Sequence, residues 1–243
     1  MNKLLSPFRF YRNFLSAKKE ICFQIVIEET DLLIKAEKHL EKEISSYVQF
    51  LRAQIKSYIE IYPQFLTSLS PLDLDPKAPY LVQQMLKAAK TAQVGPMATV
   101  AGAIAEAIAL KFVSESPNLI VENGGDTYLC STTDRIIGIL TEEKQKINLG
   151  IRIPKKDFPC SLCASSARIG HSLNFGQSDL VVVKSPSGAL ADGLATYLSN
   201  LLKTKDDLYP VLNLAQKIKK ITGLFIQIQG QIGVWGDLEL IAL

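Results

Sequence analysis

The first quarter of the chain changes its hydrophobic period near residue 30. Residues 21–28, ICFQIVIE, alternate loosely between apolar and polar and are rich in β-branched side chains, which predicts a strand. From residue 30 onward, apolar positions recur every three or four residues, which predicts one long amphipathic helix or two helices joined by a kink. Thr30 or Asp31 can cap the start of this helix, and Pro63 ends it.

The next segment predicts a loop followed by two helices. Residues 63–79 contain four prolines, which are typical of a surface loop. Residues 80–92 have helical spacing, the segment VGPM (94–97) interrupts it, and residues 98–113 continue as a second helix rich in Ala and Gly. Small residues allow a backbone or a ligand to approach closely, so this helix serves either tight helix packing or a binding site.

After Pro117 the pattern becomes a series of short strands mixed with helices. Because the strands come in hairpin-like pairs without strict β-α-β alternation, we predict an α+β fold with a largely antiparallel sheet and packed helices. No low-complexity linker and no clear short repeat is evident, so we expect a single domain over residues 1–243, or two packed α+β halves with a boundary near residue 117. The predicted strands are 118–123, 126–130, 135–141, 147–153 and 179–185, the helices are 188–203 and 208–221, and a hairpin turns about Gly230.

Composition narrows the class of protein. With 243 residues and 47% hydrophobic content, the chain can bury a sizeable core, and a net charge of +3 gives no argument for a nucleic-acid partner. The apolar stretch 94–113 contains Glu106 and Lys111, which favours a helix buried in protein over one in lipid. Arg9 and Arg12 interrupt the N-terminal apolar residues, so no secretory signal is predicted. We therefore expect a soluble cytoplasmic protein without a membrane partner.

The four cysteines give little evidence of a metal or redox site. Cys160 and Cys163 form a single C-x-x-C, and the chain has only two histidines, which is a weak basis for zinc. The pattern of a thioredoxin-like dithiol is missing. We interpret both cysteines as incidental thiols and leave their role open.

Asp192 and Thr196 are the first candidates for chemistry. They lie four positions apart in a predicted helix, so they share one face and both place oxygen atoms near one point. Mg²⁺ prefers a few protein oxygens together with water and phosphate oxygens, so the pair suits a magnesium site. In the alternative interpretation, Asp192 complements a helix start and Thr196 is an ordinary helical residue.

Residues 163–179, CASSARIGHSLNFGQSD, are the second candidate. The backbone amides of Ser165, Ser166 and Gly170 suit the binding of phosphate oxygens. His171 can act as an acid or base, or it can be a structural histidine hydrogen-bonded in a turn. The nucleophile elbow, the P-loop and the Rossmann fingerprint are all absent from the chain.

The third candidate is VENGGDTYL, residues 121–129. Gly124, Gly125 and Asp126 stand between two predicted strands, so the segment is either a tight turn or the floor of a ligand site. The local sequence leaves both interpretations open.

Taken together, these segments resemble a family of uncharacterised proteins related to ApbE, the Mg²⁺-dependent flavin transferases. The matching pieces span nearly the whole chain, and their combination is far more specific than any one of them. They are FYRNFL (10–15), EETDLLIKA (28–36), VGPMATVAGAIAEAI (94–108), VENGGDTYL (121–129), SSARIGHSLNFGQSD (165–179) and ADGLATYLSN (191–200).

The resemblance implies a T-fold-like architecture and a site that binds FAD or a related flavin nucleotide with Mg²⁺. Enzymes of the ApbE family split FAD, release AMP and attach FMN to a threonine of an acceptor protein. The resemblance implies Asp192 and Thr196 as metal ligands, and His171 and Asp192 as catalytic residues. It implies cofactor binding by Gly95, Gly124, Gly125, Asp126, Ser165, Ser166, Gly170 and His171.

The chain also departs from the transferase pattern. The K-G-x-x-x-D stretch of the transferases' middle helix corresponds here to GAIAE (102–106), and CSLCASSA (160–167) replaces a stretch expected to be rich in Gly, Thr and Ser. Three functions therefore remain open: a flavin transferase or FAD-cleaving enzyme, a non-catalytic flavin or nucleotide binder, and a structural protein. The Ala/Gly helix serves a homo-oligomer interface equally well.

Overall fold

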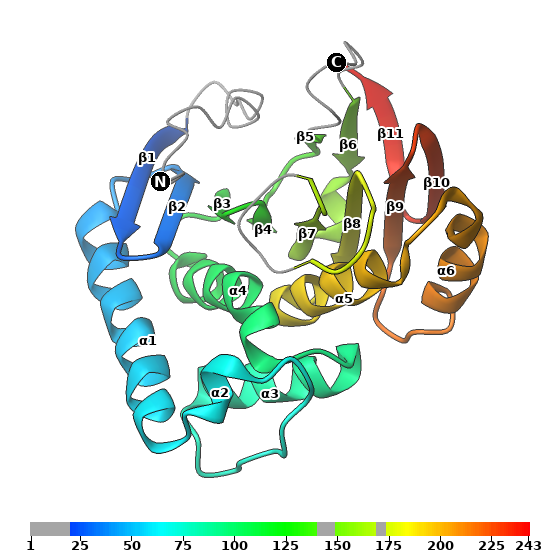
Figure 1. Cartoon of the computed structure of the whole chain (residues 1–243). Coiled ribbons are helices and arrows are strands. Elements are labelled where there is room, and N and C mark those ends of the chain that lie inside the picture. Colours follow the sequence, from blue (N-terminus) through cyan, green and yellow to red (C-terminus); the bar gives the residue numbers. More distant parts are fainter. Residues whose placement is uncertain (1–19, 140–148, 169–173) are drawn as a thin grey trace, which may run out of the picture.

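Eight antiparallel strands form the central sheet of the protein, in the order β1-β2-β3-β4-β7-β8-β9-β10 (Figure 1). The computed structural model describes residues 20–139, 149–168 and 174–243. The strands of this sheet are β1 (Ile21–Ile27), β2 (Thr30–Ala36), β3 (Leu119–Asn123), β4 (Asp126–Cys130), β7 (Cys160–Ser165), β8 (Leu180–Ser185), β9 (Gly223–Ile228) and β10 (Gln231–Gly236). The predicted α+β class with an antiparallel sheet is thus confirmed.

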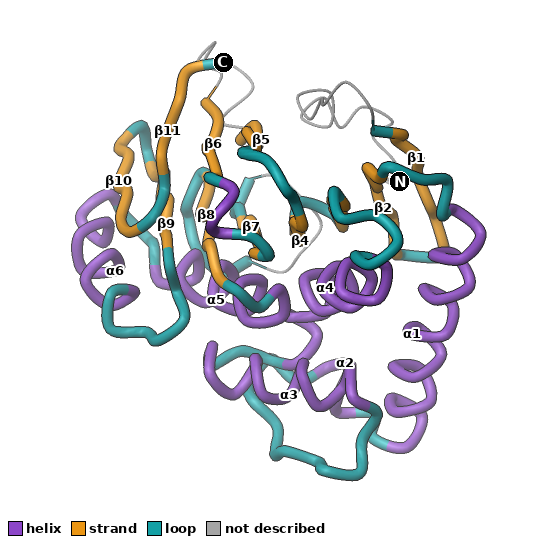
Figure 2. The backbone as a smooth tube through the Cα atoms, turned by 180° about the vertical axis from the view of Figure 1, so that it is seen from behind, coloured by secondary structure: helices purple, strands orange, loops and turns teal. Residues whose placement is uncertain are grey.

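Helices cover one face of the sheet, and a smaller sheet covers the other (Figures 1 and 2). The helices are α1 (Glu41–Ile61), α2 (Gln64–Thr67), α3 (Tyr80–Ala92), α4 (Val100–Phe112), α5 (Gly188–Leu201) and α6 (Leu208–Ala215), with single 3₁₀ turns at Pro96–Thr99, Lys155–Asp157 and Lys205–Asp207. The second sheet has the order β11-β6-β5, with β5 (Arg135–Ile139), β6 (Leu149–Ile153) and β11 (Glu239–Ala242).

Two hydrophobic cores follow from this arrangement. The larger core lies between the central sheet and the helices, and it buries such side chains as Met85, Ile108 and Leu194. The smaller core lies between the two sheets, around Leu129 and Phe225. Because successive residues of a strand point to opposite faces, the strands β3, β4, β7, β8 and β9 contribute to both cores.

The prediction of a long helix from residue 30 to Pro63 is wrong about where the helix begins. Residues 30–36 form strand β2, which pairs with β1 through a two-residue turn at Glu28 and Glu29, and the helix begins only at Glu41. The spacing of Leu33 and Ala36 suits a helix as well as a strand, and this turn carries no glycine although Glu28 has φ of 53°. Pairing with β1 and β3 decided between the two periods.

The other predictions differ mainly at boundaries and in two strands. Helix α3 and the hairpin about Gly230 are confirmed, while α6 ends at Ala215 rather than at residue 221. Strand β7 was not predicted, and neither was β11, whose residues pair with β6. Parts of the predicted strands 135–141 and 147–153 lie outside the described residues.

The order of elements repeats within the central sheet. Hairpin β1–β2, helical segments that end with α4, and hairpin β3–β4 are followed by hairpin β7–β8, helix α5 with α6, and hairpin β9–β10. In both passes, a helix crosses the same face of the sheet between two hairpins. The expected single domain, or packed halves with a boundary near residue 117, stays a prediction; residue 117 itself lies between α4 and β3.

In the described part of the chain, no single helix has the length and hydropathy to cross a membrane. Helices α3 and α4 pass that test only as a pair, and they are bent by 101° where they meet.

Candidate functional site

Helices α4 and α5 cross at two glycines, and this crossing is the centre of the site. A methyl group on Gly102 would lie 2.2 Å from the carbonyl oxygen of Gly188, and one on Gly188 would lie 2.3 Å from the carbonyl oxygen of Gly102. No side chain fits between the two backbones. The prediction of a small-residue helix that allows close approach is therefore explained by helix packing at this point.

Each of the two helices supplies a carboxylate to the N-terminus of the other. Asp192 of α5 accepts a hydrogen bond from the backbone amide of Gly102 at 2.9 Å, and the amide of Ala101 also bonds to it. Glu106 of α4 accepts from the amide of Gly188 at 2.8 Å, from that of Ala189 at 3.4 Å and from the hydroxyl of Ser187 at 3.2 Å. The first amides of a helix lack partners within the helix, so both carboxylates satisfy donors and favour the helix dipoles.

Asp126 enters the site from the sheet, at the start of β4. Gly124 and Gly125 form a two-residue hairpin turn with φ of 69° and 112°, which residues other than glycine adopt only at a cost. Among the described residues, and apart from its two chain neighbours, neither glycine has an atom within 4 Å of the position a Cβ would take, so this part of the chain leaves open space beside the turn. Glu122 closes the turn by accepting from the amide of Gly125 at 2.8 Å, and the carboxylate of Asp126 accepts from the amide of Ala164 on β7 at 3.3 Å.

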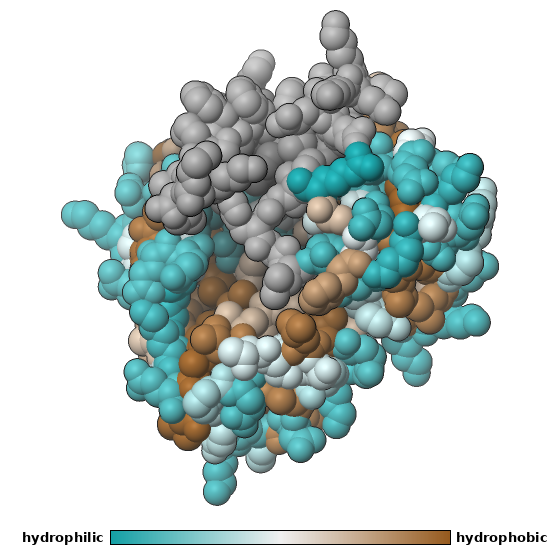
Figure 3. All heavy atoms as spheres, viewed as in Figure 1, coloured by the Kyte–Doolittle hydropathy of each residue, from teal (hydrophilic) through white to brown (hydrophobic). Residues whose placement is uncertain are grey.

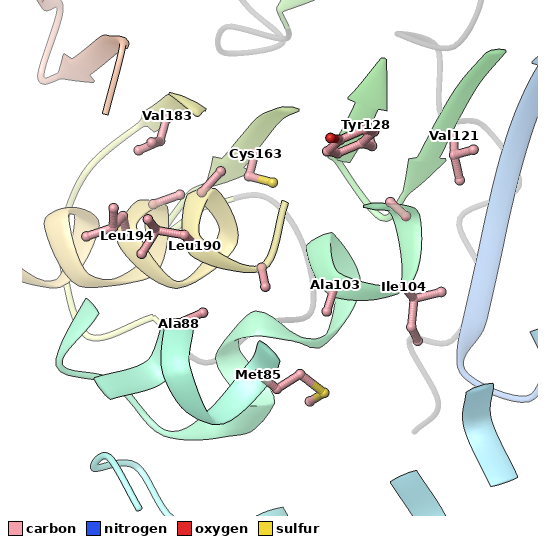
Figure 4. Packing of buried hydrophobic residues seen from close by; sticks show 14 of the residues in the cluster. Met85, Ala88, Ala103, Ile104, Val121, Tyr128, Cys163, Val183, Leu190 and Leu194 are labelled. Carbon is pink, nitrogen blue, oxygen red and sulfur yellow. The ribbon is translucent and has the colours of Figure 1, made fainter. Parts of the chain in front are cut away.

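The two aspartates and Cys163 form one buried group in which each charge shifts the pKa values of its neighbours. Burial raises the pKa of Asp126 to about 7, against hydrogen bonds from Cys163 and Ala164 that lower it. Burial, followed by the nearby charge of Asp126, raises the pKa of Asp192 well above its ordinary value. The thiol of Cys163, which lies on β7 facing α5 (Figure 4), has its pKa raised by burial and by both carboxylates. Without a cation or a bound proton, two negative charges would share one site with little water.

The C-x-x-C pair does not act as a unit, because it lies on a strand. Three positions along a strand place two side chains on opposite faces, and Cys163 lies in the larger core while Cys160 lies in the smaller one. Burial raises the pKa of Cys160 to about 12 and that of Cys130 to about 11. These thiols remain protonated near neutral pH and suit neither zinc binding nor redox exchange.

A row of hydroxyl groups continues the site along α5. Thr196 lies one turn after Asp192 and is 9% exposed, and Ser199 follows on the same side of the helix. Asn174 donates to Ser165 at 3.0 Å and to Ser199 at 2.5 Å, and this ties the segment before β8 to the end of β7 and to α5. The site thus extends as a polar seam between the helices and the sheet, with carboxylates at one end and hydroxyls at the other.

The oxygen atoms of this seam fit a hard cation of the Mg²⁺ type. Among the described residues, no group of three or more His, Cys, Asp or Glu side chains could hold a metal ion. A cation in the seam would therefore depend on few protein ligands and on oxygen atoms from water or a bound ligand. The carboxylate of Asp192 and the hydroxyl of Thr196 are hard oxygen ligands, and Mg²⁺ takes the remainder from water or phosphate. A cation there would also relieve the repulsion between Asp126 and Asp192.

The other predicted site residues do not all lie beside Asp126 and Asp192. Gly95 packs against the loop before α3, where a methyl group would lie 1.8 Å from the carbonyl oxygen of Ser68, so packing accounts for this glycine. Ser165 is the last residue of β7, and the hydroxyl of Ser166 accepts from the amide of Arg168 at 3.0 Å. Gly170 and His171 lie outside the described residues, as does the segment FYRNFL. Their assigned roles stay predictions.

Sequence reasoning missed two residues and one pattern. Glu106 was noted only as a charge in an apolar stretch, and Cys163 only as part of a C-x-x-C. The segments GAIAEAIA (102–109) and GALADGLA (188–195) are near copies, so the statement that no short repeat is evident is corrected. Alignment of these two octapeptides pairs Gly102 with Gly188 and Glu106 with Asp192. This pairing would have indicated that α4 and α5 cross at the two glycines.

A separate open groove lies at the other end of the molecule. It has a volume of about 460 Å³ between α1 and the loop before α3, and its lining includes Phe50, Tyr58 and Asp75. Figure 3 shows hydrophobic residues gathered on the lower part of the face it views. Asp75 is the one carboxylate among the described residues of this lining, and it accepts a hydrogen bond from the hydroxyl of Tyr58 at 3.2 Å.

The amino-acid sequence matches one family model and several proteins of methanogens. The model described as AbpE bacteria matches residues 12–226. A UPF0280 protein of Methanocaldococcus jannaschii is 37% identical over 222 residues, which cover 88% of this chain and 90% of the relative. A UPF0280 protein of Methanococcus maripaludis is 36% identical over the same shares.

Solved structures share the fold at low sequence identity. The flavin transferase ApbE from Vibrio cholerae superposes with a TM-score of 0.61 and 12% identity, over 89% of this chain and 96% of the other. The flavinyl transferase ApbE from Pseudomonas stutzeri gives a TM-score of 0.58 and 10% identity, over 92% and 94%. This similarity confirms the ApbE-like architecture that the sequence segments predicted.

Proposed function

We propose that this chain, which belongs to the AbpE bacteria family, binds a flavin nucleotide together with Mg²⁺ and transfers the FMN part of FAD or cleaves FAD. The seam between α4, α5 and the sheet is the proposed binding site. The family relation and the ApbE-like fold support a flavin-related role, and the site residues support the rest of the proposal.

One observation carries the proposal: Asp126 on the sheet and Asp192 on a helix are both buried and lie close enough for their charges to interact. The charge of Asp126 raises the pKa of Asp192, although 66 residues separate them in the chain. A protein rarely buries two carboxylates together without a cation or a shared proton. The open space at Gly124 and Gly125 leaves room for a ligand next to this pair.

Each group of residues has a part in this proposal. Asp192 and Thr196 would hold the cation, which supplies neutralisation of the diphosphate and of the charge that develops during phosphoryl transfer. The backbone amides at Gly124 and Gly125 border the space in which phosphate oxygens or a base edge would lie. Asp126 would accept a hydrogen bond from a ribose hydroxyl or an amine. His171 is the proposed acid or base.

The proposal is tested by incubating the protein with FAD and MgCl₂ and measuring AMP and FMN by chromatography. We expect both products with Mg²⁺ and none with EDTA. Asp192→Asn should abolish turnover, whereas Asp134→Asn, which changes an exposed aspartate paired with Arg152, should leave it unchanged. Equal turnover by the Asp192 variant would contradict the proposed role of this residue.

A second candidate function is flavin binding without catalysis. The observation that favours it is the segment AGAIAE (101–106), in which Ala101 stands where the transferases have the lysine of K-G-x-x-x-D. In this case FAD binds saturably, as measured by quenching of its fluorescence, but neither AMP nor FMN is formed at any Mg²⁺ concentration. A third reading, a purely structural protein, predicts no nucleotide binding at all.

A further inference from the structure

Glu106 has no assigned role in flavin or metal binding, yet it makes more hydrogen bonds to the α4–α5 crossing than any other described side chain. All three of its bonds go to the first residues of α5, at Ser187, Gly188 and Ala189. Burial raises its pKa, and these bonds together with the charge of Lys220 oppose that rise. The carboxylate is therefore committed to the N-terminus of α5.

The glycine crossing explains why α5 needs this bond. Where helices pack through interlocking side chains, the ridges of one helix fix the other along its axis. At Gly102 and Gly188 the two backbones meet with no side chains between them, so this contact brings the helices close but provides little resistance to sliding. Helix α5 also packs on α3, β7 and β8, and the polar bonds on either side of the crossing add to this packing in setting its axial position.

Two hydrogen bonds, one on each side of the crossing, oppose sliding of α5 along its axis. Asp192 lies one turn into α5 and binds the amide of Gly102, and its Cβ would lie 2.8 Å from a Cβ on Gly102. Glu106 lies one turn into α4 and binds the amide of Gly188 in the same way, with its own Cβ 3.1 Å from a Cβ on Gly188. Breaking one of these bonds leaves the other, together with the packing of α5 on α3, β7 and β8, to hold the register.

We propose that Glu106 is a positioning residue for Asp192. By holding the N-terminus of α5 against α4, Glu106 keeps Asp192, one turn further along, near Asp126 on the sheet, and it fixes the position of Thr196 along the same helix. The role of Asp192 and Thr196 as ligands rests on the proposed function, but their position relative to α4 does not. The inference therefore makes one prediction about structure and one about binding.

The structural prediction is tested by amide hydrogen exchange in the protein without added metal or nucleotide. The Gly102 amide is held by Asp192 and does not touch Glu106, so its exchange rate reports the position of α5. We expect Glu106→Ala to speed exchange at Gly102 about tenfold, measured by NMR on ¹⁵N-labelled protein. Glu106→Gln keeps an acceptor for the Gly188 amide and should stay within about threefold of wild type.

Glu43→Ala provides the matched control, because Glu43 is an exposed acid in the first turn of another helix, α1. It should leave Gly102 unchanged. A folded Glu106→Ala protein with wild-type exchange at Gly102 overturns the inference, since the position of α5 would then depend on packing alone. If the alanine variant does not fold, Glu106→Asp, which is shorter by one methylene, takes its place with the same expected result and the same overturning result.

The binding prediction uses Mn²⁺ as a spectroscopic substitute for Mg²⁺. We expect Glu106→Ala to weaken Mn²⁺ binding about tenfold by EPR titration, and to have no further effect in an Asp192→Asn background. Additive losses in the double variant would show that Glu106 acts independently of Asp192 and would contradict the positioning role. If wild-type protein binds no Mn²⁺ with or without FAD, the proposed function fails, and exchange at Gly102 alone decides the positioning role.

Discussion

The two ends of the α4–α5 crossing have nearly the same sequence but different chemistry. GAIAEAIA and GALADGLA each place a glycine at the crossing and a carboxylate one turn later, and each carboxylate binds the other helix's N-terminus. Glu106 is a lone acid with three donors and the charge of Lys220 nearby. Asp192 lies beside a second buried acid, Asp126.

This difference separates a structural carboxylate from a ligand-binding one. At the Glu106 end, donors compensate the charge, and the helix terminus is complete without a ligand. At the Asp192 end, the donors of α4 compensate one carboxylate, while the second acid from the hairpin adds a charge that they do not balance. The two helix caps are similar, but only the one at Asp192 has a second acid beside it, which Asp126 supplies from the β3–β4 turn. This end of the crossing is therefore the candidate cation site.

The largest expected effect is on stability as a function of pH. The folded-state pKa of Asp126 is about 7, above the ordinary 3.8, so between these values the folded protein holds a proton that the unfolded chain has lost. Stability is therefore highest at low pH in this window and falls as the pH rises. At roughly 1.4 kcal/mol per pKa unit, the loss from Asp126 reaches about 4 kcal/mol. Urea unfolding with EDTA at a series of pH values measures it.

Two additions sharpen this test. The double variant Asp126→Asn, Asp192→Asn should lose most of the decline with pH, and Mg²⁺ should restore stability to the wild-type protein at neutral pH. A Glu106→Gln variant should keep the part of the decline that comes from the acid pair and lose only the part that comes from the raised pKa of Glu106 itself. The same steep decline in the double variant would show that other groups cause it.

The next largest effect is expected where the two ends meet. Gly102→Ala places a methyl group 2.2 Å from the Gly188 carbonyl oxygen, which is backbone and cannot rotate away. We expect a loss of about 3 kcal/mol in the free energy of unfolding. Gly150→Ala is the control: the nearest described atoms to its methyl are side-chain atoms of Ile136 and Leu243 at 3.0 Å, which can move, so about 1 kcal/mol or less is expected. Equal losses of stability in the two variants would mean that α4 and α5 can move apart at the crossing at little cost.

A smaller effect is expected on ligand affinity at the Asp192 end, where a single hydroxyl can be removed. Thr196→Val removes a hydroxyl while keeping the branched shape, and we expect FAD or Mn²⁺ affinity to fall about tenfold, or roughly 1.4 kcal/mol. Isothermal titration measures this change. Thr91→Val, on the exposed face of α3, should not alter affinity. Unchanged affinity in Thr196→Val would remove this residue from the proposed ligands.

The smallest effect is expected at the Glu106 end. Ser187 caps α5 by accepting from the amide of Leu190 at 3.5 Å and donates to Glu106 at 3.2 Å. Ser187→Ala should cost about 1 kcal/mol of stability by urea unfolding, the usual cost of losing an N-cap. It should leave nucleotide affinity unchanged. A loss of affinity larger than the loss of stability would show that this end also contacts the ligand.

The sequence predicted the elements whose pattern has one interpretation. Helix α3, the hairpin about Gly230 and the two-glycine turn before Asp126 follow from local periodicity and turn chemistry, and the structure has them where they were expected. Strand β2 and strand β7 were missed for the opposite reason. Their residues suit more than one local structure, and pairing with neighbours distant in the chain decided between them.

The same division applies to the site. The sequence by itself determined that Asp192 and Thr196 share a helix face and that Gly124 and Gly125 free the turn next to Asp126, because both follow from local backbone geometry. Only the tertiary structure placed Asp126, Cys163 and Asp192 together and turned Glu106 toward α5. Burial and the proximity of like charges shift a pKa, and both arise from packing between β4, β7 and α5, which local periodicity does not specify.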